Sequence, residues 1–166
     1  RIAAAPSLRF AGVQYYCGAQ QHIESFKDRR AAIVDRTDYL KTVLQALEVS
    51  GHAPEVVTGG GTGTHQIDAE LGVLTELQTG SYVFMDKQYN DCDLDGGGRK
   101  PFETSLFVDA HVISANSASM ATIDAGFKAL STDGGLPVVV DGAPPGAMFV
   151  FMGDEHGALI APDHAF

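Results

Sequence analysis

Residues 54–64, PEVVTGGGTGT, join an apolar run to a turn made of glycines and threonines. The run Pro54 to Thr58 is short and rich in β-branched residues, which is typical of a buried strand. Glycines let backbone amides converge without interference from Cβ atoms, and threonines add hydroxyl donors. A strand that ends in such a turn is a natural phosphate-binding element. The nucleotide motifs are absent, because no lysine follows the last glycine and no frame gives GxGxxG. A merely flexible turn is the alternative interpretation.

The segments around this stretch predict an α/β layer with a parallel sheet. Leu8 to Val13 is another apolar, strand-like run, and from Gln21 to Val49 apolar side chains recur at helical spacing. Ser50-Gly51 supplies a C-terminal stop for that helix, and Leu74 to Gln78 makes a third short strand. The order strand, crossover helix, strand, turn and strand is typical of βαβ units.

The second half of the chain has a different pattern, so we predict one α/β unit over residues 1–90 and a β domain over residues 91–166. Residues 91–101, DCDLDGGGRKP, are an acidic, glycine-rich loop. Beyond it, apolar runs separated by turn residues predict an antiparallel module. These runs are Phe102 to Ser114, Ala121 to Asp124, Leu136 to Val140, Ala147 to Met152 and Ala158 to Ile160.

The composition excludes several classes of partner. The chain has 166 residues, of which 45% are hydrophobic and 19% charged, so a packed core is expected. A net charge of -10 repels nucleic acid and anionic membranes, and no apolar run approaches the ~20 residues of a transmembrane helix. Cys17 and Cys92 are too few for a disulfide scaffold. These features predict a cytoplasmic protein that binds neither nucleic acid nor a membrane.

Three further motifs have a functional and a purely structural interpretation. Asp91, Asp93 and Asp95 imitate the start of an EF-hand loop, but Phe102 stands where the bidentate glutamate belongs, so we prefer a solvated acidic hairpin tip. The GDEHG segment, residues 153–157, could hold a metal or a proton-transfer pair, although such clusters are more often turns. Nothing adjacent to Cys17 would activate it as a nucleophile.

Several segments, in order, carry a resemblance to one family. They are Leu8 to Gly18 followed by Gln21-His22, Thr58 to Thr64, Glu76 to Asp86 (ELQTGSYVFMD), Ile123 to Ser131 and Asp154 to Gly157. Together they resemble the D-threonine aldolases, with the related 3-hydroxy-D-aspartate aldolases and eukaryotic-type D-serine dehydratases. The matches extend across nearly the whole chain.

The resemblance implies a fold-type III pyridoxal 5'-phosphate enzyme of the alanine-racemase-like kind. Such an enzyme has a (β/α)8 TIM-type barrel followed by an antiparallel β domain, so residues 1–90 would be the C-terminal part of the barrel. The cofactor would lie at the carboxyl ends of the strands. The cofactor-binding residues that the resemblance implies are Tyr16 near the ring, the amides of Gly61, Thr62, Gly63 and Thr64 at the phosphate, Gln78 at the pyridine nitrogen, and Ser81 and Tyr82 as further donors.

The resemblance also implies parts that these residues do not match. The Schiff-base lysine of the family lies in a basic segment near the amino terminus, and none of the lysines at 27, 41, 87, 100 and 128 has that context. The metal ligands follow the Asp154 signature as an H-C-D or H-x-C element, whereas residues 162–166 are PDHAF. We therefore expect the catalytic lysine and the ligands of a divalent metal (Mn, Mg or Zn) outside this chain, and no activity from the chain alone.

The activity implied by the resemblance is a lyase reaction on β-hydroxy-D-amino acids, in an enzyme that is a homodimer. We favour an aldolase acting on D-threonine or 3-hydroxy-D-aspartate, because the ELQTGSYVFMD element is most similar to the aldolase branch. A dehydratase acting on D-serine or 3-hydroxyaspartate is the alternative within the family. A non-catalytic pyridoxal-phosphate-binding protein is the alternative from another class, and the strands after Phe102 argue against it.

Overall fold

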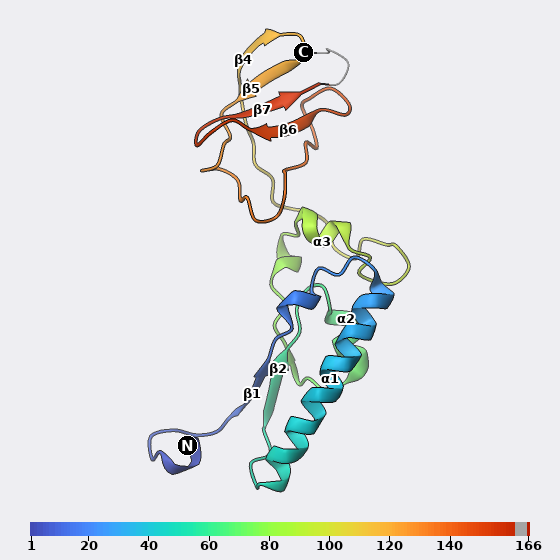
Figure 1. Ribbon diagram of the computed structural model, residues 1–166, viewed down its shortest axis with the longest axis vertical. Coiled ribbons are helices and arrows are strands. Elements are labelled where there is room, and N and C mark those ends of the chain that lie inside the picture. Colours follow the sequence, from blue (N-terminus) through green and yellow to red (C-terminus); the bar gives the residue numbers. More distant parts are fainter. Residues whose placement is uncertain (162–165) are drawn as a thin grey trace. The chain divides into compact units, whose positions relative to one another are not determined.

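The computed structural model describes residues 1–161 and 166, and it divides into two units, Arg1–Ser105 and Leu106–Phe166 (Figure 1). The boundary predicted at residues 90/91 precedes this division. The difference arises because the loop after α3 (Lys87–Asp91) is held by the first unit: the amide of Asp93 donates to the carbonyl of Glu24 at 3.0 Å.

A parallel sheet forms the centre of the first unit, with strand order β1-β2-β3. The strands are β1 (Gly12–Tyr15), β2 (Val56–Gly59) and β3 (Glu76–Leu77). Tyr15 is in register with Gly59, and Gly59 with Leu77, so the carboxyl ends of all three strands are level. This confirms the predicted parallel α/β layer. Among the described residues the parallel sheet has three strands, and the closed barrel implied by the resemblance is not shown by this chain.

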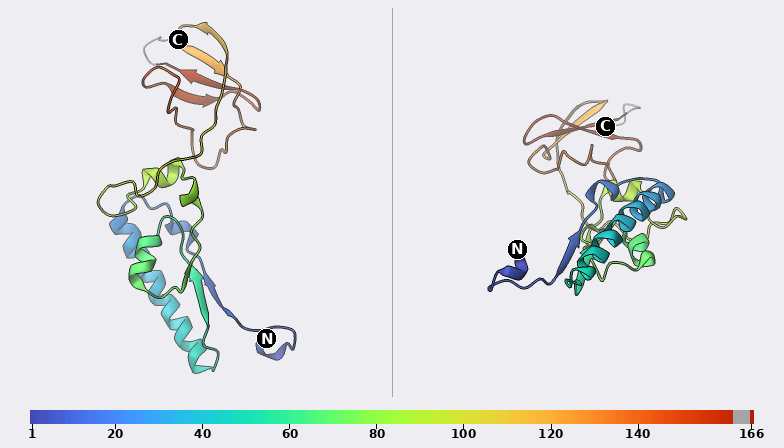
Figure 2. Two further views of the ribbon diagram at one scale, coloured as in Figure 1. Left: turned by 180° about the vertical axis from the view of Figure 1, so that it is seen from behind. Right: turned by 60° about the horizontal axis from the view of Figure 1, so that its bottom comes forward.

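Helix α1 (Phe26–Val49) is the predicted crossover from β1 to β2 and lies beside both strands (Figure 2). It begins because the Ser25 hydroxyl accepts a hydrogen bond from the amide of Asp28 at 3.3 Å, and it ends at Ser50 ahead of Gly51, whose φ is +77°. Its buried residues, Arg29, Ile33, Thr37 and Leu40, follow one stripe of the helix surface.

The remaining helices of the first unit are short. Helix α2 (His65–Leu71) packs against α1 and ends at Gly72, while 3-10 turns form η1 (Ile2–Ala4), η2 (Gly18–Gln20) and η3 (Ser81–Val83). An apolar cluster lies around α3. Its buried members are Met85, Tyr89, Cys92 and Leu94, and Phe102 packs against them.

The second unit is the predicted antiparallel module, a four-stranded sheet with strand order β4-β5-β7-β6. Its strands are β4 (Val112–Ser117), β5 (Met120–Ile123), β6 (Met148–Phe151) and β7 (Gly157–Ile160). Ile123, Ala125, Phe149 and Leu159 form its core. The strand predicted over residues 136–140 is wrong: Leu136, Val138 and Val140 are exposed, and Pro137 has no amide hydrogen for a ladder.

Within the described residues, no helix combines the length with the apolar composition that crossing a membrane requires.

Candidate functional site

The glycine- and threonine-rich turn follows β2 at the level carboxyl edge of the parallel sheet. Residues 60–64 are all buried, and Thr62 and Thr64 keep only 2% and 0% of their surface exposed. The sequence analysis did not predict α2, which begins directly after this turn. The turn is therefore an ordered, buried loop between β2 and α2 and not a merely flexible connection.

Glycine is required in the loop because Gln21 packs directly against its backbone. A Cβ atom on Gly61 would lie 2.5 Å from Gln21 Oε1, and one on Gly63 would lie 2.0 Å from the Gln21 carbonyl oxygen. Gly60 has a φ of +66°, a left-handed conformation that other residues rarely adopt. The glycine pattern in the sequence thus reflects both close approach and backbone conformation.

Most of the predicted phosphate donors already have acceptors inside the protein. The amide of Gly61 donates to Thr64 Oγ1 at 3.2 Å, that of Gly63 to Gln21 Oε1 at 3.1 Å, and that of Thr64 to the Gly61 carbonyl at 3.1 Å. These distances lie at the long end of the usual range. Of these four amides, that of Thr62 is the one with no acceptor among the described residues.

Two of the other predicted residues lie beside this loop. The Tyr16 hydroxyl is 3.1 Å from the position of a Cβ on Gly61, and nearly half of the Tyr16 surface is exposed. The amide of Tyr82 donates to Thr62 Oγ1 at 3.1 Å, which ties η3 and Ser81 to the loop. The fold therefore brings Tyr16, Ser81 and Tyr82 together with the glycine- and threonine-rich turn.

Gln78 lies at the end of β3 on the face of the sheet opposite α1. Its Oε1 accepts a hydrogen bond from Gln14 Nε2 at 3.2 Å, and both side chains are exposed. On the same face Thr58 donates to Glu76 Oε1 at 2.7 Å. The other face turns toward α1, where the Tyr15 hydroxyl donates to the Arg36 carbonyl. Gln78 thus belongs to a polar sheet face at the same edge as the loop.

The site also contains Tyr89 and His22, to which the sequence analysis assigned no role. Their rings are 4.4 Å apart, and Tyr89 is only 5% exposed. Burial, and next the neighbouring Tyr16 hydroxyl, raise the pKa of Tyr89 to about 12, while the Ser81 hydroxyl opposes the shift. Tyr89 therefore stands as a neutral hydroxyl next to two of the predicted residues. Only its apolar position on a short helix marks it in the sequence.

This shift predicts a pH dependence. The phenol of Tyr89 ionises more easily in the unfolded chain, near pH 10, than in the folded one, near pH 12. Folding stability from this group is therefore complete below about pH 10 and is lost as the pH rises toward 12. In a spectrophotometric titration of tyrosinate, Tyr89→Phe should remove one tyrosine from those that ionise late. Identical titration curves for the two proteins would contradict the assignment.

The structure does not support Cys17 as a nucleophile or the GDEHG segment, residues 153–157, as a metal site. Burial raises the pKa of the Cys17 thiol, so the thiol is not activated. In the GDEHG segment Glu155 pairs with Lys128, and the amides of Met152 and Gly153 donate to the His156 carbonyl at 3.1 Å. This segment is the turn that joins β6 to β7, as the structural interpretation had it.

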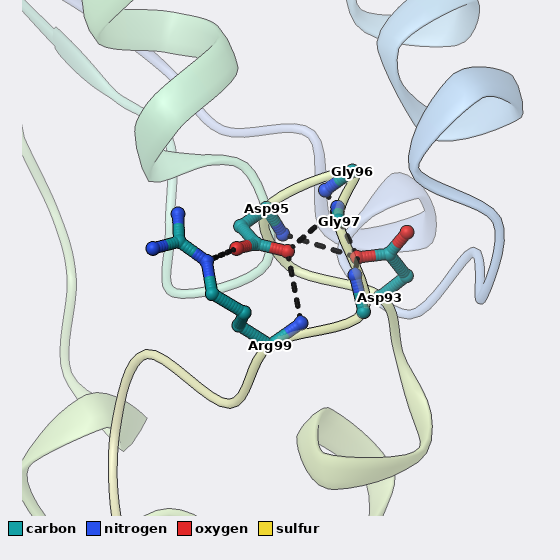
Figure 3. A network of polar contacts seen from close by, with 6 residues as sticks. Asp93, Asp95, Gly96, Gly97 and Arg99 are labelled. Carbon is teal, nitrogen blue, oxygen red and sulfur yellow. Dashed lines mark hydrogen bonds and ion pairs between the residues drawn. The ribbon is translucent and has the colours of Figure 1, made fainter.

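The acidic loop uses its carboxylates to bind its own backbone (Figure 3). Asp93 Oδ1 accepts the amide of Gly96 at 2.9 Å, and Asp95 Oδ1 accepts the amide of Gly97 at 2.8 Å. The Gly97 amide and then Arg99, whose Nε donates to Asp95 Oδ2 at 2.6 Å, lower the pKa of Asp95. Arg29 of α1 donates to the Asp93 carbonyl, so the start of the loop is held by the fold, while residues 96–100 are exposed, as expected for a solvated tip.

No cluster of three or more His, Cys, Asp and Glu side chains suited to a metal ion occurs in the part of the chain that the structure describes. The sequence analysis compared residues 162–166 with the metal-ligand element of the family. Asp163 and His164 of that segment lie outside the described residues.

Comparisons with known proteins show what the chain is similar to. Residues 105–165 match the family model described as "Putative serine dehydratase domain". The 3-hydroxy-D-aspartate aldolase of Paracoccus denitrificans (strain Pd 1222) is 41% identical over 161 residues, which cover 95% of this chain and 41% of that protein. The chain thus spans about two fifths of the length of this curated relative.

The chain is also similar to solved structures of an aldolase and a dehydratase. The D-threonine aldolase from Filomicrobium marinum is 40% identical with a TM-score of 0.88, and the match covers 97% of this chain and 42% of that one. The D-threo-3-hydroxyaspartate dehydratase from Delftia sp. HT23 is 27% identical with a TM-score of 0.69, over 95% of this chain and 44% of the other. Over nearly its whole length, the chain is therefore similar to a segment of this D-threonine aldolase and of the Paracoccus 3-hydroxy-D-aspartate aldolase.

Proposed function

We propose that the protein carrying this chain is a pyridoxal 5'-phosphate-dependent lyase that cleaves the Cα–Cβ bond of D-threonine or 3-hydroxy-D-aspartate. The observation that carries the proposal is the match to a D-threonine aldolase over 97% of the chain, at 40% identity and a TM-score of 0.88. The lower identity of the dehydratase, 27%, favours the aldolase reaction.

The residues at the loop suit the phosphate of such a cofactor. The Thr62 amide, the Tyr16 hydroxyl and the Ser81 hydroxyl are neutral donors, which an anion can accept without a competing charge. The carboxyl group closest to the loop backbone, Asp68, is buried against Gly60, and burial raises its pKa, so its negative charge is disfavoured. These features support a phosphate site at the loop.

The cofactor, when bound, supplies an electron sink for the electron pair that Cα–Cβ cleavage leaves behind. In this proposal the loop and Tyr16 bind and orient it, and Gln78 hydrogen-bonds the ring nitrogen. A neutral amide, held by Gln14, cannot stabilise a full positive charge on that nitrogen as a carboxylate would. Gln78 therefore moderates the electron sink.

Replacing Gln78 by Glu tests this placement. The new carboxylate would favour protonation of the ring nitrogen, so the absorbance of the bound cofactor should acquire a different pH dependence. Gln45→Glu, the same charge change on the exposed side of α1, is the matched control and should leave the titration unaltered. If the Gln78→Glu protein titrates like the wild type, Gln78 does not face the nitrogen.

The whole protein has parts that we infer from the family. We propose a (β/α)8 barrel that includes β1, β2 and β3, a homodimer, a divalent metal (Mn, Mg or Zn) and a catalytic lysine outside this chain. The lysines at 41, 87 and 128 support the last point, since they pair with Asp38, Asp91 and Glu155.

The reaction itself is tested with the whole protein, pyridoxal 5'-phosphate and a divalent metal. An aldolase releases glycine from D-threonine or 3-hydroxy-D-aspartate, together with acetaldehyde or glyoxylate, and leaves the L-amino acids untouched. Release of ammonia and a 2-oxo acid would instead identify the dehydratase, which the match of residues 105–165 to a serine dehydratase domain supports as the second candidate. Cofactor binding without turnover of either kind would leave the non-catalytic binding protein.

A further inference from the structure

A buried network of polar side chains holds the glycine- and threonine-rich loop from behind. Thr64 Oγ1 is its centre: it accepts hydrogen bonds from Gln21 Nε2 at 3.1 Å and from the Gly61 amide at 3.2 Å, and it donates to Asp68 Oδ2 at 2.6 Å. A hydroxyl has one donor and two acceptor positions, so Thr64 uses all of them within the protein.

Gln21 holds the loop at a second point. Its Oε1 accepts from the Gly63 amide at 3.1 Å, and its Nε2 also donates to the Cys17 carbonyl at 3.3 Å. These contacts fix the orientation of the amide, because exchanging its oxygen and nitrogen would set donor against donor at Gly63. Gln21 comes from the segment after β1, which precedes the loop in the sequence, and Asp68 comes from α2, which follows it. The loop is therefore held from both sides.

Burying these polar side chains calls for a physical reason. Gln21 is 1% exposed and Asp68 6%, and a buried polar group destabilises a fold unless it is hydrogen-bonded. Apolar side chains of similar size would fill the same volume without that cost. What they could not do is fix the backbone of a loop whose glycines offer no side chains to pack.

We propose that Gln21 and Asp68 are positioning residues that act through Thr64 to hold the loop, residues 60–64, in the conformation that accepts a phosphate group. This inference rests on the proposed function, in which the phosphate belongs to pyridoxal 5'-phosphate. Neither side chain needs to touch the ligand. Their effect reaches it through the Gly61, Gly63 and Thr64 backbone that they bind.

The test compares two ligands that differ only in the phosphate, pyridoxal 5'-phosphate and pyridoxal. The whole protein, freed of cofactor, is titrated with each by absorbance, and its thermal unfolding is measured without ligand. Gln21→Leu and Asp68→Ala should bind pyridoxal 5'-phosphate at least tenfold more weakly than the wild type, with pyridoxal affinity unchanged within twofold. Asp68→Asn keeps an acceptor for the Thr64 hydroxyl and should recover most of the loss. Glu70→Gln, on the exposed side of the same helix, should behave like the wild type.

Other outcomes overturn the inference in distinguishable ways. Equal weakening of both ligands would mean that the network supports the fold and not the phosphate site, and unchanged affinities would mean that it supports neither. A wild-type protein that binds both ligands alike would remove the phosphate site itself, and with it the proposed function. If Asp68→Ala does not fold, Thr64→Val removes the central hydroxyl at a similar volume. The ratio of its affinities for pyridoxal 5'-phosphate and pyridoxal then tests the inference in the same way.

Discussion

Gly63→Ala should destabilise the first unit by about 3 kcal/mol and weaken binding of the cofactor by more than tenfold. The added Cβ atom would lie 2.0 Å from the Gln21 carbonyl oxygen and 2.8 Å from its carbonyl carbon, and both are backbone atoms that cannot rotate away. The loop must move, and the bond from the Gly63 amide to Gln21 Oε1 is lost with it. Denaturant unfolding and a cofactor titration measure the two effects.

Gly80→Ala is the matched control for this substitution. No atom lies within 4 Å of a Cβ at Gly80, and its φ of −130° is outside the left-handed region that favours glycine. The variant should therefore stay within about 0.5 kcal/mol of the wild type. Gly63→Ala and Gly80→Ala proteins of equal stability would show that the loop does not pack against Gln21 as the structure has it.

The sequence predicted the loop but not what holds it. Glycines and threonines after a β-branched run are a local pattern, and the turn lies at the residues for which this pattern predicts it. The partner of the Gly63 amide is Gln21, 42 residues earlier, and no local pattern links two positions so far apart. Helix α2 was missed for a related reason, because its 7 residues span too few turns for a periodic pattern to be visible.

The acidic loop shows the same limit in a different form. Aspartates at 93 and 95 followed by glycines can form a calcium loop, a solvated turn or a loop that caps its own amides, and Phe102 argues only against the first of these. The structure has the third arrangement, in which Asp93 accepts the Gly96 amide and Asp95 accepts the Gly97 amide. The deciding contact is long-range: Arg29 donates to the Asp93 carbonyl across 64 residues.

Arg29→Ala is the second substitution with a large expected effect, a loss of about 3 kcal/mol or more. The guanidinium is 0% exposed and donates to the carbonyls of Ile23, Glu24 and Asp93, while Nε has no partner among the described residues. Burial lowers the pKa of Arg29, and the neighbouring Cys92 and Asp93 offset this shift only in part. Removing Arg29 leaves the part-buried carbonyl groups of Ile23 and Asp93 without this donor, at about 1–3 kcal/mol each, and also a cavity.

Two further variants divide this loss into its causes. Arg29→Met keeps most of the apolar volume against Phe26, whose ring centre is 5.6 Å from the guanidinium carbon, but it supplies no donors. Arg29→Lys keeps one charge and three donors on a single atom, which cannot reach both the Ile23-Glu24 segment and the acidic loop in the same way. If hydrogen bonding dominates, Arg29→Met should lose nearly as much stability as Arg29→Ala, and Arg29→Lys should lie between them and the wild type.

The control for this series is Arg36→Met, whose half-exposed guanidinium pairs with Asp35. A surface pair of this kind contributes little, so the variant should stay within about 0.5 kcal/mol of the wild type. Amide hydrogen exchange locates the damage: it should speed up over residues 92–99 and over η3, because the cluster of Met85, Tyr89, Cys92 and Leu94 joins the acidic loop to the segment that donates to Thr62. Exchange that stays slow at η3 while the acidic loop opens would show that Arg29 stabilises the loop alone and does not support the proposed cofactor site.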